Sequence, residues 1–136
     1  MSTLVLRYMP DPADEVGQLW FDVRTAQFSG SGFFWSNLNE LPGIISKLES
    51  YPLGDSAEWI WGYGQAEEPD AVLSLRVEQS SPTGDLKVRV GIRDLYEPEH
   101  FLRSTFQTDY ASLEALRHEL VQMREHRAGE AVLSGN

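Results

Sequence analysis

Several residue types that can support catalysis are present, but their spacing completes no catalytic motif. His118 and Glu119 begin a zinc-peptidase pattern whose second histidine would fall at position 122, where the chain has Gln122. The stretch 29–32 reads Ser-Gly-Ser-Gly, which lacks the lysine of a phosphate-binding loop and does not match a nucleophile elbow. We interpret it as a glycine bulge or turn. The chain has no cysteine, which excludes a thiol nucleophile and thiolate metal ligands. We therefore expect neither a metal nor a cofactor.

Isolated carboxylates on predicted strands leave one enzymatic alternative open. Asp22, Glu58 and Glu78 could pair across a sheet as the general acid and general base of a hydrolytic enzyme. Nothing in their spacing requires this arrangement. The simpler role is that of ion-pair partners for the arginines that lie on neighbouring strands. An enzyme is thus the less favoured interpretation.

Basic side chains gather on one side of the predicted strands, opposite most of the apolar positions. In the segment 71–94, a four-residue turn at 81–84 keeps both apolar faces on the same side of a hairpin. This register places Arg76 beside Arg89 and Glu78 beside Lys87. Two adjacent arginines repel each other unless an anion lies between them. The cationic side of the sheet is either an ordinary solvated face or a face that binds anions and carboxylates. The strand residues concerned are Arg7, Arg24, Arg76, Lys87, Arg89, Arg93 and Arg103.

An aromatic ladder lies in the stretch 57–64, Ala-Glu-Trp-Ile-Trp-Gly-Tyr-Gly. Strand alternation puts Trp59, Trp61 and Tyr63 on one face, and Ile60 and two glycines on the other. The ladder either fills the core or faces outward, with helices packed closely over the glycines. Trp20 favours the outward arrangement, because it alternates with charged residues opposite an apolar face. An outward ladder would combine with the arginines into a cation–π surface.

The elements that position these residues alternate between strand and helix patterns. Apolar alternation predicts strands at 3–9, 17–25, 57–65, 71–80, 85–94 and 100–107, and a further extended run at 27–35. Helical periodicity predicts a first helix from about Asn39, with Pro42 in its first turn, and a second over 109–127 that stops at Gly129. Residues 1–136 therefore predict a single α+β domain, an antiparallel sheet of five to six strands with two helices packed on one face. We expect the tail after about residue 128 to fray.

Composition narrows the possible partners and compartments. The 136 residues include 21 acidic and 11 basic side chains, a formal net charge of −10. Such a chain repels phosphate backbones, so we expect no nucleic-acid partner. We also expect no membrane association, because no apolar stretch approaches spanning length and the N-terminal apolar run is too short for a signal peptide. The chain is predicted to be cytoplasmic, with a protein partner of basic character or a second copy of itself.

The order of aromatic landmarks along the chain resembles that of small uncharacterised bacterial α+β domains. These landmarks are Phe33-Phe34-Trp35 before the first helix, Tyr51-Pro52 after it, the tryptophan- and glycine-rich strand, and Phe106 to Tyr110 before the second helix. Some such domains are similar to immunity proteins of toxin systems, which are typically small, acidic and cytoplasmic. The resemblance implies an immunity-like binding role and assigns no functional residue.

We therefore favour a non-enzymatic interaction module that binds a protein partner through a sheet face bearing aromatic and arginine side chains. The alternative is a protein that binds a small molecule or anion in a pocket near Trp59, Trp61, Arg76 and Arg89. The third hypothesis is the hydrolytic enzyme. The candidate binding residues are Trp20, Arg24, Trp59, Trp61, Tyr63, Arg76, Lys87 and Arg89.

Overall fold

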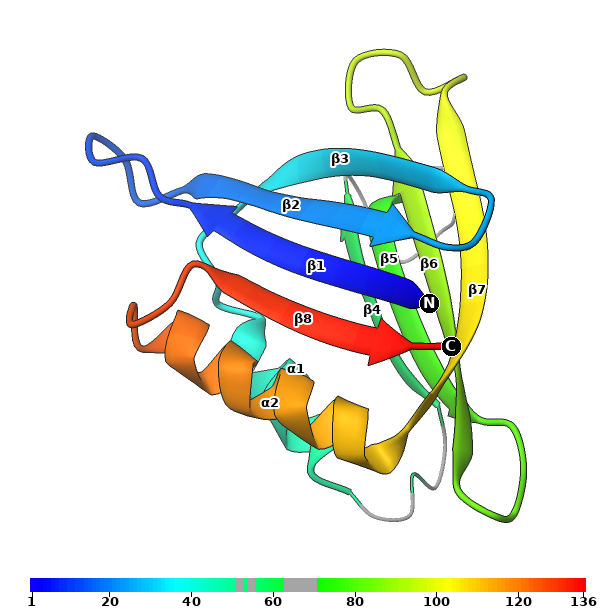
Figure 1. The fold of residues 1–136 in the computed structure, drawn as a ribbon. Coiled ribbons are helices and arrows are strands. Elements are labelled where there is room, and N and C mark those ends of the chain that lie inside the picture. The colour runs from blue at the N-terminus through cyan, green and yellow to red at the C-terminus, as the bar shows by residue number, and fades with distance from the viewer. Residues whose placement is uncertain (51–52, 54–55, 63–70) are drawn as a thin grey trace.

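The computed structural model describes residues 1–50, 53, 56–62 and 71–136, which form two antiparallel sheets and two helices (Figure 1). Sheet A has the strand order β3-β2-β1-β8 and sheet B has the order β4-β5-β6-β7. The α+β class is confirmed, whereas a single sheet of five to six strands is wrong. The elements are β1 (Ser2–Met9), β2 (Gly17–Arg24), β3 (Ser29–Ser36), α1 (Leu41–Leu48), β4 (Ala57–Gly62), β5 (Ala71–Gln79), β6 (Asp85–Arg93), β7 (Phe101–Asp109), α2 (Tyr110–Arg124) and β8 (Glu130–Gly135).

The strands of the two sheets cross steeply in Figure 1, and their apolar faces enclose the core. Leu4 and Phe21 contribute from sheet A, and Leu75 and Val88 from sheet B, each almost completely buried. Buried side chains from both sheets and both helices belong to one hydrophobic cluster. Alternation along each strand predicted which side is buried, but it carries no information on which strands share hydrogen bonds.

The segment after residue 128 is a strand, so the expectation of a frayed tail is wrong. β8 pairs with β1, with Leu133 opposite Leu4 and Ala131 opposite Leu6. Ala131 and Leu133 are fully buried. Burial of these two side chains and a ladder of backbone hydrogen bonds together offset the entropy of ordering so short a segment.

Two glycines of β3 allow this strand to lie close to sheet B. A Cβ atom on Gly32 would come within 2.5 Å of Ile92 Cγ2, and one on Gly30 within 3.0 Å of Leu102 Cδ1. β3 pairs with β2 without a register shift, so the predicted bulge or turn at 29–32 is wrong. Close approach of backbone to a packed element, which the sequence suggested for the glycines of the 57–64 segment, is observed at these two glycines of β3.

The two helices lie beside β8 and β4 rather than together on one face of a sheet. α2 packs along β8, and α1 packs against α2 and reaches β4 (Figure 1). Pro42 occupies the first turn of α1, as predicted. The end of α2 differs from the expectation: His126, not Gly129, takes the left-handed conformation (φ 61°). His126 N–H donates to Met123 O and Arg127 N–H donates to Gln122 O, the two bonds of a Schellman motif.

The aromatic ladder belongs to the core. Trp59 and Trp61 are only 8% and 5% exposed. The ring of Trp61 meets that of Phe21 edge-on at 5.4 Å, and Lys47 Nζ of α1 lies 5.9 Å from the Trp59 ring centroid. The interpretation in which this ladder faces outward as a binding surface is therefore wrong for both tryptophans. Tyr63 lies outside the described residues.

Candidate functional site on the outer face of sheet B

Strand alternation in sheet B sends polar and charged side chains to the outer face, the face turned away from the core. The predicted register of the β5–β6 hairpin is confirmed, with Arg76 opposite Arg89 and Glu78 opposite Lys87. Neighbouring strands extend these pairs into rows across the sheet. One row runs Glu58, Arg76, Arg89 and Thr105, and the next runs Ile60, Ser74, Gly91 and Arg103.

The repulsion expected between Arg76 and Arg89 is relieved by an internal carboxylate. Glu78 Oε1 accepts a hydrogen bond from Arg89 Nε at 2.8 Å, and Glu78 Oε2 lies 3.3 Å from Arg76 Nε. Arg76 also pairs with Glu58, Nη1 to Oε2, at 3.5 Å. The hydrogen bond from Arg89, together with the nearby positive charges, holds the pKa of Glu78 below its usual range. Glu58 and Glu78 therefore act as ion-pair partners, the simpler of the two roles predicted for them.

At the opposite end of the face, two arginine side chains make cation–π contacts with an aromatic ring. The guanidinium carbons of Arg93 and Arg103 lie 5.3 and 6.0 Å from the ring centroid of Phe101. Arg93 Nη1 also donates to Pro98 O at 3.3 Å. Guanidinium groups stacked on an aromatic ring keep their in-plane N–H donors directed outward, where a carboxylate or phosphate can accept from two of them.

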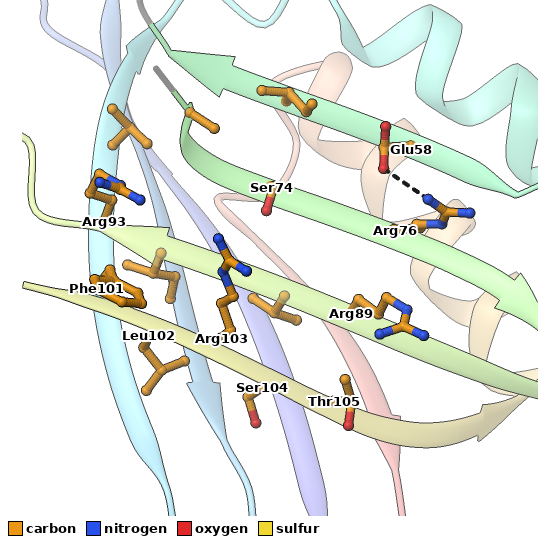
Figure 2. A pocket seen from close by; sticks show the side chains of 16 residues that line it. Glu58, Ser74, Arg76, Arg89, Arg93, Phe101, Leu102, Arg103, Ser104 and Thr105 are labelled. Carbon is orange, nitrogen blue, oxygen red and sulfur yellow. Dashed lines mark ion pairs between the residues drawn. The ribbon is translucent and has the colours of Figure 1, made fainter. Parts of the chain in front are cut away.

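A shallow pocket of about 460 Å³ separates these two ends (Figure 2). Gly91 contributes no side chain to it, and a Cβ atom at this position would lie 2.4 Å from Ser74 Oγ. Figure 2 shows the guanidinium of Arg103 pointing from β7 toward Ser74. The walls combine these polar groups with the apolar side chains of Ile60 and Phe101. The pocket can thus offer guanidinium and hydroxyl donors to an anion, and apolar surface to the body that carries it.

The residues predicted to form one binding surface occupy three separate places. Arg76 and Arg89 line the pocket, and Lys87 lies on the same face next to Glu78. Trp20 and Arg24 belong to β2 in sheet A. Trp59 and Trp61 lie on the opposite, core-facing side of β4. The predicted pocket near two tryptophans and two arginines is therefore wrong in its tryptophans and correct in placing the two arginines side by side.

The candidate site also contains residues absent from that prediction, namely Ser74, Gly91, Arg93, Phe101 and Arg103. Both of these arginines were recognised as strand residues on the cationic side. Their position could have been found by extending the hairpin register to the next strand, which places Arg103 opposite Gly91. The aromatic ring that organises them gives no comparable signal, because Phe101 begins its strand and breaks the apolar alternation.

Sheet A has an outer face of a different kind, formed by aromatic side chains. The rings of Trp20 and Phe33 stack at 4.8 Å, and Trp35 and Tyr96 lie 5.7 and 6.5 Å from Phe33. We call these four residues the aromatic band. Arg7, the register partner of Trp20, pairs with Asp22 at 3.6 Å. The aromatic and arginine features that the sequence combined on one face are thus concentrated on two different sheets.

The described ranges contain no group of three or more histidine, aspartate or glutamate side chains placed to hold a metal ion. His118 pairs with Glu114 at 3.3 Å and His100 with Glu97 at 3.0 Å, both at the surface. No helix in this part of the chain is long and apolar enough to cross a membrane.

These features define an α+β protein with two crossed four-stranded antiparallel sheets, a helix pair and a cationic pocket on one sheet. Searches for a matching family model, a matching curated protein and a matching solved structure each found none.

Proposed function

We propose that this protein is a binding module that holds a small organic anion in the pocket on the outer face of sheet B. The observation that carries the proposal is the group of four arginines around a side-chain-free position, Gly91. Guanidinium groups bind carboxylates and phosphates through paired hydrogen bonds. The bare backbone at Gly91 lets a ligand approach the sheet, and Ser74 adds a hydroxyl donor.

The local charge supports an anionic ligand on a chain whose net charge is −10. Among the described residues of this face are the acids Glu58 and Glu78 and the bases Arg76, Lys87, Arg89, Arg93 and Arg103. The two glutamates pair with Arg76 and Arg89. Arg93 and Arg103 lie at the other end of the face, beside the apolar side chains of the pocket.

The apolar side chains that line the pocket favour one class of anion over another. Phe101 is exposed, and Ile60 and Val72 also line the pocket. A bare phosphate would leave these side chains exposed to water, whereas a carboxylate on an aromatic or aliphatic body would cover them. Glu58 and Glu78 would in addition repel a ligand of high negative charge. We therefore favour a monocarboxylate with an apolar body.

The catalytic alternative receives less support from this geometry. Glu58 and Glu78 are each held by arginine, and the pKa of Glu78 is lowered. A general acid at neutral pH needs a raised pKa. A hydrolytic role for these two carboxylates is therefore disfavoured on electrostatic grounds.

Amide chemical shifts can test the proposal. Benzoate, benzyl alcohol and inorganic phosphate are titrated at constant ionic strength while the amides of Ser74, Gly91 and Arg103 are followed by NMR. We expect benzoate to shift these amides saturably, and benzyl alcohol and phosphate to shift them much less. The Arg93→Ala/Arg103→Ala double variant should abolish the benzoate response, whereas Arg24→Ala, on sheet A, should preserve it. If no anion shifts these amides in the wild type, the proposed function is wrong; if phosphate matches benzoate, only the monocarboxylate assignment is wrong.

A further inference from the structure

The aromatic band on sheet A is bordered by a hollow of about 430 Å³ that opens between β3 and the loop joining β6 to β7. Trp20 and Phe33 line it from the sheet, and Tyr96 and Asp94 from the loop. His100, which pairs with Glu97, also lines it. The hollow thus presents aromatic rings and a carboxylate to the same small volume.

Two members of the aromatic band, Trp35 and Tyr96, are exposed large aromatic side chains. Trp35 is 41% exposed and Tyr96 is 75% exposed. Met9 and Trp35 are the register partners of Gln18 on its two neighbouring strands, so Met9 lies in the same cross-strand row as Trp35. Trp20 is held in place, since its Nε1–H donates to Gln18 Oε1 at 2.9 Å. Ordered aromatic side chains of this kind form the energetic centre of many protein interfaces.

The loops at the border of the band favour a basic partner. Acidic loops lie at two of its borders: the β1–β2 loop, which leaves sheet A beside Met9, and the β6–β7 loop, which rises beside β3 (Figure 1). Neither loop contains lysine or arginine. The exposed acids of these loops are Asp11, Asp14, Glu15, Asp94, Glu97 and Glu99.

Asp94 is the acid that lines the hollow together with the rings. Its Oδ1 accepts hydrogen bonds from the backbone N–H groups of Tyr96 (2.8 Å) and Glu97 (2.9 Å). These bonds fix the carboxylate at the edge of the hollow and hold its pKa below the usual range. A carboxylate beside aromatic faces is the environment that binds a guanidinium or ammonium group, through one charge-assisted bond and cation–π contacts.

We propose that the aromatic band docks a basic protein segment, with one arginine or lysine side chain inserted in the hollow between Trp20, Phe33, Tyr96 and Asp94. The acidic loops form the rim of the interface and attract the partner, while the rings provide the buried contact. The hollow adjoins the pocket on sheet B, and Phe101 lines both. Trp20, Phe33, Tyr96 and Asp94 line the hollow alone, so this inference does not rest on the proposed function.

The test uses the peptide acetyl-Gly-Arg-Arg-Gly-amide, with a citrulline peptide of the same length as the uncharged control. Binding is followed by NMR from the indole N–H of Trp20 and from the amides of Asp94 and Tyr96. We expect the arginine peptide to shift these signals saturably and the citrulline peptide to bind at least about tenfold more weakly, the equivalent of about 1.4 kcal/mol.

Two variants that each remove one negative charge distinguish binding in the hollow from general electrostatic attraction to an acidic protein. Asp94→Asn should weaken the arginine peptide about tenfold, whereas Glu58→Gln, which removes one carboxylate from sheet B, should change it less than about twofold. Tyr96→Ala, at an exposed position, should weaken binding without lowering the melting temperature. Equal effects of Asp94→Asn and Glu58→Gln, or shifts spread over the whole acidic surface, would overturn the proposal. Concentration-dependent self-association in sedimentation that Tyr96→Ala abolishes would also overturn it, because a second copy of this chain would then occupy the band.

Discussion

Substitution of Trp61 by alanine tests whether the aromatic ladder supports the fold or a binding face. The indole is 5% exposed and packs edge-on against Phe21 in the core. Truncation of a buried tryptophan costs about 3–5 kcal/mol of unfolding free energy. A domain has about 5–15 kcal/mol in total, so Trp61→Ala should remove about a fifth or more of the stability.

The same loss can be expressed as a melting temperature. An unfolding entropy of about 2.1 cal/mol/K per residue, over 136 residues, gives about 0.29 kcal/mol/K. A loss of 3–5 kcal/mol therefore lowers the melting temperature by roughly 10–17 °C. Circular dichroism melts and urea unfolding at neutral pH measure both quantities.

Two further variants make the result interpretable. Trp35→Ala removes a tryptophan that is 41% exposed, and should cost less than about 1 kcal/mol. Trp61→Phe keeps an apolar ring, so it should fold even where alanine does not. If Trp61→Ala and Trp35→Ala destabilise the protein equally, by less than about 1 kcal/mol, the ladder does not lie in the core.

Three other predictions concern α2. Leu116 is fully buried, so Leu116→Ala should cost about 2–5 kcal/mol by opening a cavity; a loss below about 1 kcal/mol in urea unfolding would contradict its assignment to the core. His126→Gly should raise the unfolding free energy by up to about 1 kcal/mol, since glycine adopts the left-handed conformation at φ 61° without a Cβ penalty; an unchanged or lower melting temperature would argue against that conformation. Asp109 caps α2 by accepting the Ser112 N–H at 2.8 Å, so Asp109→Ala should cost about 1 kcal/mol at pH 7. That bond lowers the pKa of Asp109, so the stabilisation is present above the unfolded-state pKa of about 3.9 and is lost as the pH falls through the folded-state pKa. Unfolding curves of wild type and variant should converge in acid; a difference that persists there would refute the carboxylate as its source.

Local pattern predicted the strands that precede α2, but it missed β8 and did not predict how the strands assemble into two sheets. The hairpin register followed from apolar alternation and turn length alone, because both act over a few residues. The division into two sheets did not, because it depends on which apolar faces meet across the core. Alternation predicts a buried side for each strand and leaves its hydrogen-bonded neighbours undetermined.

In the candidate site, too, the sequence predicted the contacts within one hairpin but not the side on which the tryptophans of β4 lie. The sequence predicts that Arg76 and Arg89 lie side by side and that an anion is needed between them, but it does not identify the anion. That anion is Glu78, which lies two positions from Arg76 on the same face. The orientation of Trp59 and Trp61 could not be decided, because glycines on one side of a strand are compatible with close packing or with solvent. Gly30 and Gly32 of β3 are glycines at which the structure shows close packing.

The pairing of β1 with β8 has a consequence for cooperativity. Leu4 lies opposite Leu133, so sheet A is complete only when segments from distant parts of the chain meet, whereas sheet B consists of strands that follow one another. α2 follows β7 of sheet B directly and packs along β8 of sheet A, so it links the two sheets mechanically. Detachment of β8 would expose the apolar side of α2 and remove the hydrogen-bonded partner of β1. Native-state hydrogen exchange should therefore report the same opening free energy for the amides of Leu133 and Leu75, as a single unit that unfolds together.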